Sequence, residues 1–427
     1  MLNVNEASQR FFALRLRMME KAARNDEVLG TVEPAREQSM HEVIGQARSA
    51  FRQRYGRLPA VYGIAPGRVE VLGNHTDYNG GYVMSAAIDR VTVVAVHRAT
   101  NRRCRVFATQ KGAEATFPLD AIQRDPHDHW ADYVKGVVVE LQKVGIPVEP
   151  FEAVVAGNVP IGAGVSSSAS LEVATAVALQ ELHEASLPRW EIAKLCRRAE
   201  NEFVGMPCGI LDQFSAVFGE RDNILFLDTR TEEHEAIPLP PGSFGLILVH
   251  SMAQHTLVRG DYATRYRECM EAAQWFRQRL GEHVSLLRDV SWQELEQWEA
   301  QMPEPLRRRA RHVISENQRV LDGRDALHRG DVVRLGALMY ASHESSRLDY
   351  ENSTPELDLL VDLAKERGAI GARLTGAGWG GATINLVQEE QMEDFARRVA
   401  AEYTRRTNIQ PAVYRCHIAP GATTIRE

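Results

Sequence analysis

Residues 159–170 read VPIGAGVSSSAS, and residues 171–182 directly after them read LEVATAVALQEL. The apolar segment 151–155 before this stretch predicts a strand, and the apolar residues after it recur at helical spacing. Between the two elements lie two glycines and four serines. Because this composition makes a poor core but a good cradle for an anion, we take the stretch as the centre of the fold.

The predicted role of this stretch is to hold the phosphates of a nucleotide. Its glycines allow the backbone to approach a ligand closely, and the following helix directs its free N–H groups and positive dipole end into the loop. The serine hydroxyls add donors and an oxygen ligand for a hard cation such as Mg²⁺. No G-K-[ST] follows the glycines, and an ordinary serine-capped turn would show the same local pattern. The predicted phosphate-binding residues are Gly162, Ala163, Gly164, Val165, Ser166, Ser167 and Ser168.

The composition is that of an ordinary soluble protein, with 427 residues, a formal net charge of −7 and 44% hydrophobic residues. The mild acidity argues against non-specific binding to nucleic acid or membranes. Five scattered cysteines without a C-x-x-C pair favour reduced thiols over a disulfide scaffold or a zinc site. No apolar run approaches the ~20 residues of a membrane span, and the start MLNVNEASQR does not resemble a secretory signal. We therefore expect a cytoplasmic protein without nucleic-acid or membrane partners.

The length and the breaker residues predict two domains after an N-terminal extension. Residues 1–50 are rich in Arg, Glu, Gln and Met and predict helices with a packing role. The segment PLPPG (238–242) is the clearest breaker in the chain, so we predict an N-terminal domain over 51–238 and a C-terminal domain over 239–427. The basic run 307–311 predicts a solvated helix face, because acidic residues precede it and no aromatic residues interleave.

Three further segments carry chemistry-bearing residues without deciding a function. Arg68, His75 and Asp77 lie on or beside a predicted turn, which a polar hairpin would also explain. Asp212 follows a Gly/Pro break and is either a helix cap or a working carboxylate. The segment 369–387 has five glycines within eleven residues, which suggests backbone against a ligand or a glycine-rich turn.

Together, these segments resemble one family of enzymes. The first reads PGRVEVLGNHTDYNGG (66–81), the second PIGAGVSSSASLEVA (160–174) and the third LTGAGWGGATINLV (374–387). GMPCGILDQF (205–214), HTLVRGDYATRYREC (255–269) and SHESSRLDYENSTPELD (342–358) fit the same pattern. From about residue 55 onward the chain is similar to galactokinases, within the superfamily of galacto-, homoserine, mevalonate and phosphomevalonate kinases. The resemblance implies a two-domain α+β fold with the active site in the cleft between the domains.

The resemblance also implies a reaction. ATP would transfer its γ-phosphoryl group to the anomeric hydroxyl of galactose, giving galactose 1-phosphate. Asp212 matches the family's base, and Arg68 lies beside it, where a guanidinium favours the charged carboxylate and stabilises transition-state charge. Ser168 and Glu200 match the Mg²⁺ ligands, a hydroxyl and a carboxylate that suit this cation.

The family pattern assigns further residues to the two substrates. Trp130 matches an aromatic position near the nucleotide base, although a core tryptophan would fit equally, and the third motif adds Gly376 and Gly378 to the predicted nucleotide site. The predicted sugar-binding residues are Asn74, His75, Thr76, Asp77, Gly209 and Tyr262.

One departure from the family concerns the sugar. Most galactokinases carry Glu where this chain has Asn74, and Asn where it has Glu70. The family's Glu accepts a hydrogen bond from a sugar hydroxyl, and Asn74 keeps an acceptor but loses the charge. We expect galactose to remain the substrate, with about 1 kcal/mol of affinity at stake; the lost charge could instead admit a sugar with a C6 carboxylate.

Two alternatives remain open at this point. The first is a kinase of the same fold that acts on galacturonate, N-acetylgalactosamine or arabinose. The second is a non-catalytic sensor of sugar and ATP. The complete serine run and the presence of Arg68, Glu200 and Asp212 favour an enzyme over the sensor.

Overall fold

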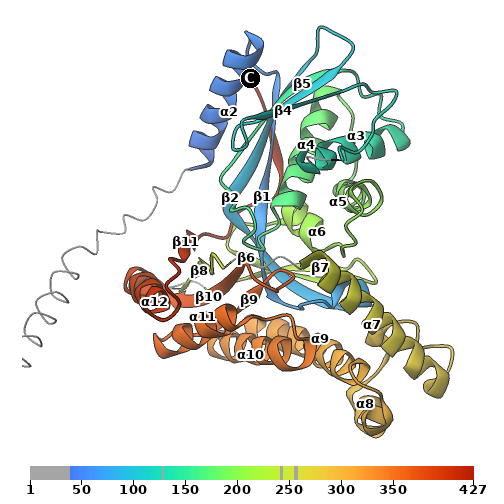
Figure 1. The fold of residues 1–427 in the computed structure, drawn as a ribbon, viewed down its shortest axis with the longest axis vertical. Coiled ribbons are helices and arrows are strands. Elements are labelled where there is room, and N and C mark those ends of the chain that lie inside the picture. Colours follow the sequence, from blue (N-terminus) through green and yellow to red (C-terminus); the bar gives the residue numbers. More distant parts are fainter. Residues whose placement is uncertain (1–38, 127–128, 241–243, 254–257) are drawn as a thin grey trace, which may run out of the picture. The chain divides into compact units, whose positions relative to one another are not determined.

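The computed structural model describes residues 39–126, 129–240, 244–253 and 258–427, with side chains described from residue 261 in the last range. All of them belong to one compact unit of the chain. The helices predicted for the N-terminal extension lie outside the described residues up to residue 38, and the remaining part of that segment begins the helix α2 (Met40–Tyr55). Figure 1 labels this and the other elements.

The first sheet has eight strands, ordered β12-β1-β2-β5-β3-β4, with β6 pairing with β2 and β7 pairing with β6. All pairs are antiparallel except β3 with β5. Its strands are β1 (Val61–Leu72), β2 (Tyr82–Arg98), β3 (Cys104–Ala108), β4 (Ala113–Phe117), β5 (Phe151–Gly157), β6 (Asn223–Asp228), β7 (His234–Pro238) and β12 (Thr423–Arg426).

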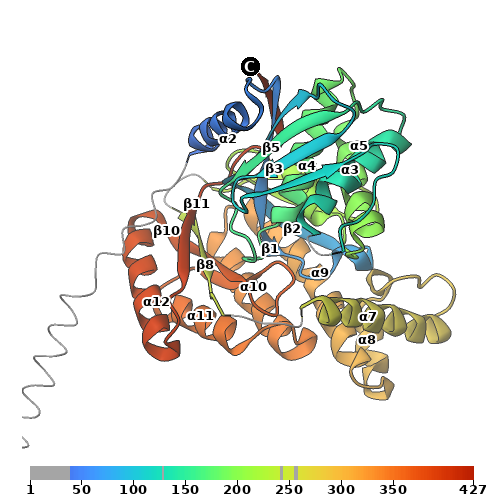
Figure 2. The same ribbon diagram turned by 45° about the horizontal axis from the view of Figure 1, so that its top comes forward.

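Helices cover both faces of this sheet, as Figure 2 shows. One face packs against α2, through residues such as Phe51 and Tyr62. The other face packs against a helical layer made of α3 (Asp132–Lys143), α4 (Ser167–Leu182), α5 (Arg189–Arg198) and α6 (Leu211–Phe218). Strands that are buried on both faces read as continuous apolar runs, which explains the sequence VTVVAV in β2.

The second sheet is fully antiparallel, in the order β11-β8-β10-β9. Its strands are β8 (Phe244–His250), β9 (Gly371–Thr375), β10 (Ala382–Gln388) and β11 (Ala412–Cys416). The helices of this half are α7 (Val258–Leu280), α8 (Trp292–Trp298), α9 (Leu306–His328), α10 (Val332–Ser345), α11 (Pro355–Glu366) and α12 (Met392–Thr407). A core shared by β1, β2, β8, β10, α9 and α10 joins the two sheets.

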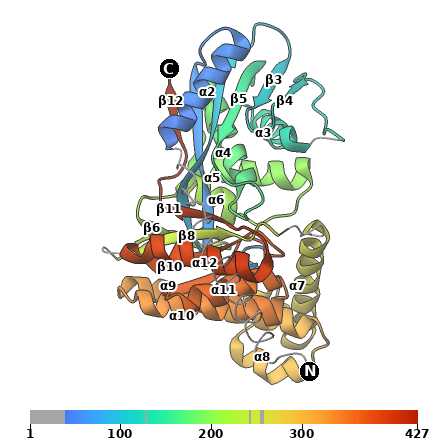
Figure 3. The ribbon, with the colours of Figure 1, turned by 60° about the vertical axis from the view of Figure 1, so that its left-hand side comes forward.

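The chain returns to its first sheet at the end, as Figure 3 shows. After β11, the strand β12 pairs antiparallel with β1, so that Val61 faces Arg426 and Ile64 faces Thr423. β7 ends at Pro238 and β8 begins at Phe244 in the other sheet. The predicted division of the chain near residue 238 falls between these two strands and stays a prediction, since residues 241–243 lie outside the described residues.

The secondary structure predicted around the phosphate loop is confirmed. The strand predicted from residue 151 is β5, and the helix predicted after the loop is α4. Two π-helical turns, η3 (Ala199–Val204) and η6 (Ser346–Tyr350), end α5 and α10. Such turns occur frequently at functional sites. Among the described residues, no helix has the length and apolar character that crossing a membrane requires.

Candidate active site

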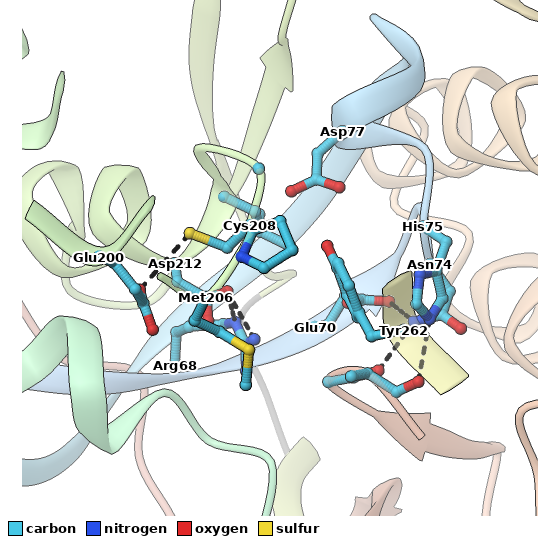
Figure 4. Close-up of a pocket in the computed structure, with 15 residues that line it drawn as sticks. Arg68, Glu70, Asn74, His75, Asp77, Glu200, Met206, Cys208, Asp212 and Tyr262 are labelled. Carbon is cyan, nitrogen blue, oxygen red and sulfur yellow. Dashed lines mark hydrogen bonds and ion pairs between the residues drawn. The ribbon is translucent and has the colours of Figure 1, made fainter. Parts of the chain in front are cut away.

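A cavity of about 750 Å³, including its open mouth, lies where β1, η3, α6, α7 and the loop after β9 meet. Figure 4 shows four carboxyl groups around it and one arginine at its edge. The lining residues are Arg68, Glu70, Asn74, His75, Asp77, Glu200, Met206, Pro207, Cys208, Gly209, Leu211, Asp212, Tyr262, Gly376 and Ala377.

Arg68 and Asp212 form a close ion pair at one end of the cavity. The Arg68 Nε atom donates to Asp212 Oδ1 over 2.8 Å, and its Nη2 lies 2.5 Å from the same oxygen. The arginine side chain is only 6% exposed, whereas that of Asp212 is 27% exposed and open to the cavity. Asp212 lies in the first turn of α6, whose N-cap is Ile210. Asp212 is therefore not the helix cap, and its carboxylate is free to face a ligand.

The same arginine connects this pair to the predicted phosphate loop. Its Nη1 donates to the carbonyl oxygen of Gly164 over 2.6 Å, and its backbone N–H donates to the carbonyl oxygen of Val165 over 3.2 Å. β1 carries register shifts on both sides of this segment, between Pro66 and Arg68 and between Glu70 and Leu72. The irregular strand thus places Arg68 between the loop and α6.

The loop itself ends in a strained residue. Ser166 is the N-cap of α4 with φ of 57°, a conformation that non-glycine residues seldom adopt. Its side chain is buried, and its hydroxyl oxygen finds no hydrogen-bond partner among the described residues. Strain of this kind collects at ligand sites, and the N-terminus of a sixteen-residue helix favours an anion.

The phosphate loop packs backbone to backbone against the third motif. A Cβ at Gly164 would lie 2.7 Å from the carbonyl oxygen of Thr375, and a Cβ at Gly376 would lie 2.5 Å from that of Gly164. A Cβ at Gly378 would lie 2.2 Å from the carbonyl oxygen of Asn352. These glycines bring protein backbones together, a role that the sequence pattern did not separate from ligand contact.

Glu200 lies on the π-helical turn η3 and lines the cavity beside Asp212. Its Oε2 accepts from Gln213 Nε2 over 2.7 Å and from the Cys208 thiol over 3.5 Å, and the Ser168 hydroxyl also donates to it. Burial and the charge of Asp212 raise the pKa of Glu200 to about 7. Two carboxylates that repel each other favour a cation bound between them. No cluster of three or more His, Cys, Asp or Glu side chains suited to a metal occurs in the ranges that the structure describes.

Asn74 is 0% exposed, and both polar atoms of its side chain bond to protein. Its Nδ2 donates to Glu70 Oε1 and to the carbonyl oxygen of Gly376, each over 2.8 Å. Its Oδ1 accepts from Asn352 Nδ2 over 2.7 Å and from the Ser346 hydroxyl over 3.4 Å. The side-chain amide of Asn74 therefore fixes the loop after β1 to residues in the second half of the chain.

His75 and Thr76 use their polar atoms in the same way. His75 Nε2 lies 2.9 Å from the carbonyl oxygen of Ala377, to which it donates, so Nδ1 accepts from the Tyr78 hydroxyl over 2.8 Å. Burial lowers the pKa of His75 to about 3, which keeps the ring neutral. The Thr76 hydroxyl donates to the backbone, with the Gly73 carbonyl oxygen 2.7 Å away, and Thr76 does not line the cavity.

Asp77 presents its carboxylate to the cavity instead. Its Oδ1 accepts from the backbone N–H of Tyr78 over 2.9 Å, and Oδ2 would lie 1.7 Å from a Cβ at Gly209. Burial, with the charge of Asp212, raises the pKa of Asp77 to about 6. The carboxylate and the glycine thus form one closely packed wall of the cavity.

We expect Asp77→Asn to stabilise the fold at about pH 8. The pKa of Asp77 is about 6 in the folded chain and near 3.9 in an unfolded one. The ionised group therefore destabilises the folded state above pH 6, and this penalty fades as the pH falls toward 4. Allowing for the partial exposure of Asp77, we expect a gain of roughly 1–2 kcal/mol. Thermal unfolding of both proteins at about pH 8 and about pH 4.5 measures it; equal midpoints at the higher pH would contradict the expectation.

Comparison with known proteins decides the family. The family model described as the galactokinase galactose-binding signature matches residues 49–98. Those for the N-terminal and C-terminal domains of GHMP kinases match residues 132–220 and 324–405. The galactokinase of Roseiflexus sp. (strain RS-1) is 42% identical over 388 residues, which cover 90% of this chain and 97% of that protein. The chain belongs to the galactokinase family.

Solved structures agree with this assignment. The fold of this galactokinase-family chain is similar to the crystal structure of Lactococcus lactis galactokinase complexed with galactose. The TM-score is 0.85 and the sequence identity is 32%, and the match covers 89% of this chain and 99% of the other. The mevalonate kinase of Methanococcus jannaschii has a TM-score of 0.61 at 20% identity, over 84% and 98% of the two chains, which shows a shared fold alone. The predicted family and its α+β fold are confirmed.

In this galactokinase-family chain, nine of the nineteen predicted site residues line the cavity, and the residues of the loop 162–168 are not among them. Trp130 is half-buried on the core beside α3 and does not line the cavity. Tyr262 does line it, with its ring centroid 5.3 Å from that of His75. The sequence reasoning did not assign six of the lining residues to the site: Glu70, Met206, Pro207, Cys208, Leu211 and Ala377. Cys208 and Ala377 lie beside Gly209 and Gly376, which the sequence analysis had singled out, and this adjacency is the signal that could have found them.

Proposed function

We propose that this chain transfers the γ-phosphoryl group of ATP to the anomeric hydroxyl of galactose and forms galactose 1-phosphate. The observation that carries the proposal is the Arg68–Asp212 pair, which opens to the cavity and bonds to the phosphate loop through Gly164. A carboxylate and an anion cradle that share one arginine are suited to phosphoryl transfer to an alcohol.

In the proposed reaction, Asp212 accepts the proton of the anomeric hydroxyl as its oxygen bonds to the γ-phosphorus. The bond between that phosphorus and the β,γ-bridging oxygen breaks, and ADP leaves with the bond's electron pair. Arg68 holds the carboxylate in place through Nε and Nη2 and is close enough to the loop to stabilise charge on the transferring group. The products are galactose 1-phosphate, ADP and the proton on Asp212.

We assign the nucleotide to the loop 162–168 and to the N-terminus of α4. The hydroxyl of Ser166, without a partner among the described residues, and the free N–H groups of α4 support this assignment. Ser168 and Glu200 fit a divalent cation, because their oxygens are adjacent and the Glu200 carboxylate is crowded by Asp212. Bound there, Mg²⁺ would neutralise phosphate charge.

We assign the sugar to the part of the cavity between Asp212 and Asp77. The Asp77 carboxylate, the Tyr262 hydroxyl and the backbone at Gly209 face it and offer hydrogen bonds to sugar hydroxyls. Asn74 and His75 also line the cavity, and we propose that they act by fixing the loop on which Asp77 lies.

We expect Gly209→Ala to weaken sugar binding without affecting the nucleotide. The new Cβ would overlap Oδ2 of Asp77, so the carboxylate must move away from the sugar. Loss of a charged hydrogen bond corresponds to a rise in KM for galactose of about tenfold, whereas KM for ATP should change less than about twofold. Steady-state kinetics with each substrate varied in turn measures both. An equal rise in the two KM values would show that the added methyl group disturbs the whole site.

A coupled ADP-release assay tests the proposed function. The substrates are Mg-ATP with galactose, galacturonate, N-acetylgalactosamine or arabinose. Four carboxyl groups line the cavity, from Glu70, Asp77, Glu200 and Asp212, which disfavours a sugar that carries its own carboxylate. We expect galactose to have the highest kcat/KM. Absence of turnover with every sugar would support the sensor, and a higher kcat/KM for galacturonate would overturn the substrate.

We also propose a reducing, cytoplasmic environment for the protein. No disulfide bond joins any of the five cysteines, all of which lie in the part of the chain that the structure describes, and four of them are buried.

A further inference from the structure

Glu70 is a carboxylate of the cavity to which the proposed reaction gives no role. It lies on β1 two residues after Arg68, and residues two apart on a strand project from the same face. Figure 4 shows Glu70 between the Arg68–Asp212 pair and Asn74. The two positions are about 6.5–7 Å apart along the strand, which is comparable to the width of a pyranose ring.

The structure fixes this carboxylate from one side only. Oε1 of Glu70 accepts from Asn74 Nδ2 over 2.8 Å and lies 3.0 Å from Nη2 of Arg373, and the backbone N–H donates to Thr375 Oγ1 over 2.8 Å. Oε2 accepts no hydrogen bond from the residues that the structure describes, yet it is not sealed from solvent. Glu70 thus has one anchored oxygen and one available oxygen at a cavity wall.

Charge balance indicates that Glu70 is ionised. Arg373 is 0% exposed and cannot lose its proton. Its carboxylate neighbours are Glu70 at 3.0 Å and Glu316 at 3.9 Å, and Glu316 is already paired with Arg319. Burial raises the pKa of Glu70, but without the charge of Glu70 a buried guanidinium would lack its closest counter-ion.

We propose that Glu70 contacts the sugar directly, and that its Oε2 accepts a hydrogen bond from a hydroxyl on the side of the ring opposite the anomeric carbon. This proposal rests on the function proposed above. A sugar with its anomeric hydroxyl at Asp212 extends along β1 and brings its C3, C4 or C6 substituent to Glu70. The anchored oxygen orients the carboxylate before binding, which lowers the entropic cost of the contact. The same charge repels a carboxylate at that position of the sugar.

The test combines Glu70→Gln with a series of deoxy sugars. Gln keeps an acceptor for Asn74 and Arg373 but removes the charge, and the substrates are galactose and its 3-, 4- and 6-deoxy analogues. We expect kcat/KM for galactose to fall about tenfold in the variant. For the analogue that lacks the contacted hydroxyl, the fall should be less than about threefold, because the contact is already absent. Galacturonate should gain relative to galactose in the variant.

Other outcomes separate this inference from its alternatives. An equal fall for all four sugars would show that Glu70 acts only as the counter-ion of Arg373 and would overturn the inference. Glu316→Gln is the matched control, because Glu316 also faces Arg373 but does not line the cavity, and it should affect all sugars equally. If Glu70→Gln does not fold, Glu70→Asp retains the charge, withdraws the carboxylate and permits the same comparison. Wild-type protein without activity on galactose would instead refute the proposed function.

Discussion

Replacing Asp212 by Asn should lower kcat by about 10²–10⁴-fold, while the Kd values of galactose and ATP stay nearly unchanged. Asn keeps the size of the side chain and an oxygen that can accept from Arg68 Nε, so the site should remain assembled. The amide of Asn cannot accept the proton of the anomeric hydroxyl, so the substitution should slow phosphoryl transfer rather than weaken the binding of either substrate. Rapid-quench measurement of the phosphorylated sugar gives the rate of that step, and calorimetric titration gives the two affinities.

A second aspartate–arginine pair provides the control for this experiment. Asp228 pairs with Arg288 outside the cavity, with Oδ2 accepting from Nη2 over 2.7 Å. Asp228→Asn should therefore leave kcat within about twofold of the wild type, because it touches neither substrate. Undiminished turnover in Asp212→Asn would show that another group accepts the proton, and the roles assigned around Arg68 would have to be withdrawn.

Replacing Asn74 by Glu should destabilise the protein by about 3–5 kcal/mol, the cost of leaving a buried charge without a partner. The new carboxylate would face the Glu70 carboxylate at hydrogen-bonding distance and the carbonyl oxygen of Gly376, in place of the two N–H groups that now bond to them. Asn74 is 0% exposed, so water does not reach the contact between the two side chains. The thermal unfolding midpoint and the free energy of unfolding from urea denaturation measure the loss of stability.

The reciprocal double variant should recover more than half of that loss. Glu70→Asn combined with Asn74→Glu restores one amide and one carboxylate to the pair, in the order that galactokinases usually carry. Because the two side chains touch, we expect the effects of the two substitutions to be strongly non-additive. Simple additivity of the two single variants would contradict the contact between these side chains and weaken the case for Glu70 as a residue with one anchored oxygen.

Local features made the strand and the helix around the proposed phosphate loop predictable from sequence. The loop 162–168, the strand before it and the helix after it are contiguous, so composition and spacing sufficed. Asp212 was predicted as a helix cap or a working carboxylate; its position after the N-cap Ile210 excludes the cap, and its pairing with Arg68, 144 residues earlier, favours the carboxylate.

The sugar side was less predictable, because its contacts come from distant parts of the chain. Asn74 and His75 were predicted to contact the sugar, yet their polar atoms bond to groups near residues 352 and 377. No local pattern indicates which way such side chains turn. The prediction that residues 307–311 form a solvated helix face was wrong for Arg309, which is 2% exposed and bonds to Glu268 and Glu351. Pairing of that kind requires the tertiary fold.

The pairing of β12 with β1 has a consequence for synthesis of the chain. The strand at residues 423–426 completes the edge of a sheet whose other strands lie before residue 239. A ribosome that has made the first half has therefore produced a β1 with an open backbone edge, which neighbouring chains can recognise. Until residues 423–426 have been synthesised, this edge of β1 lacks its partner strand and is open to pairing with another chain.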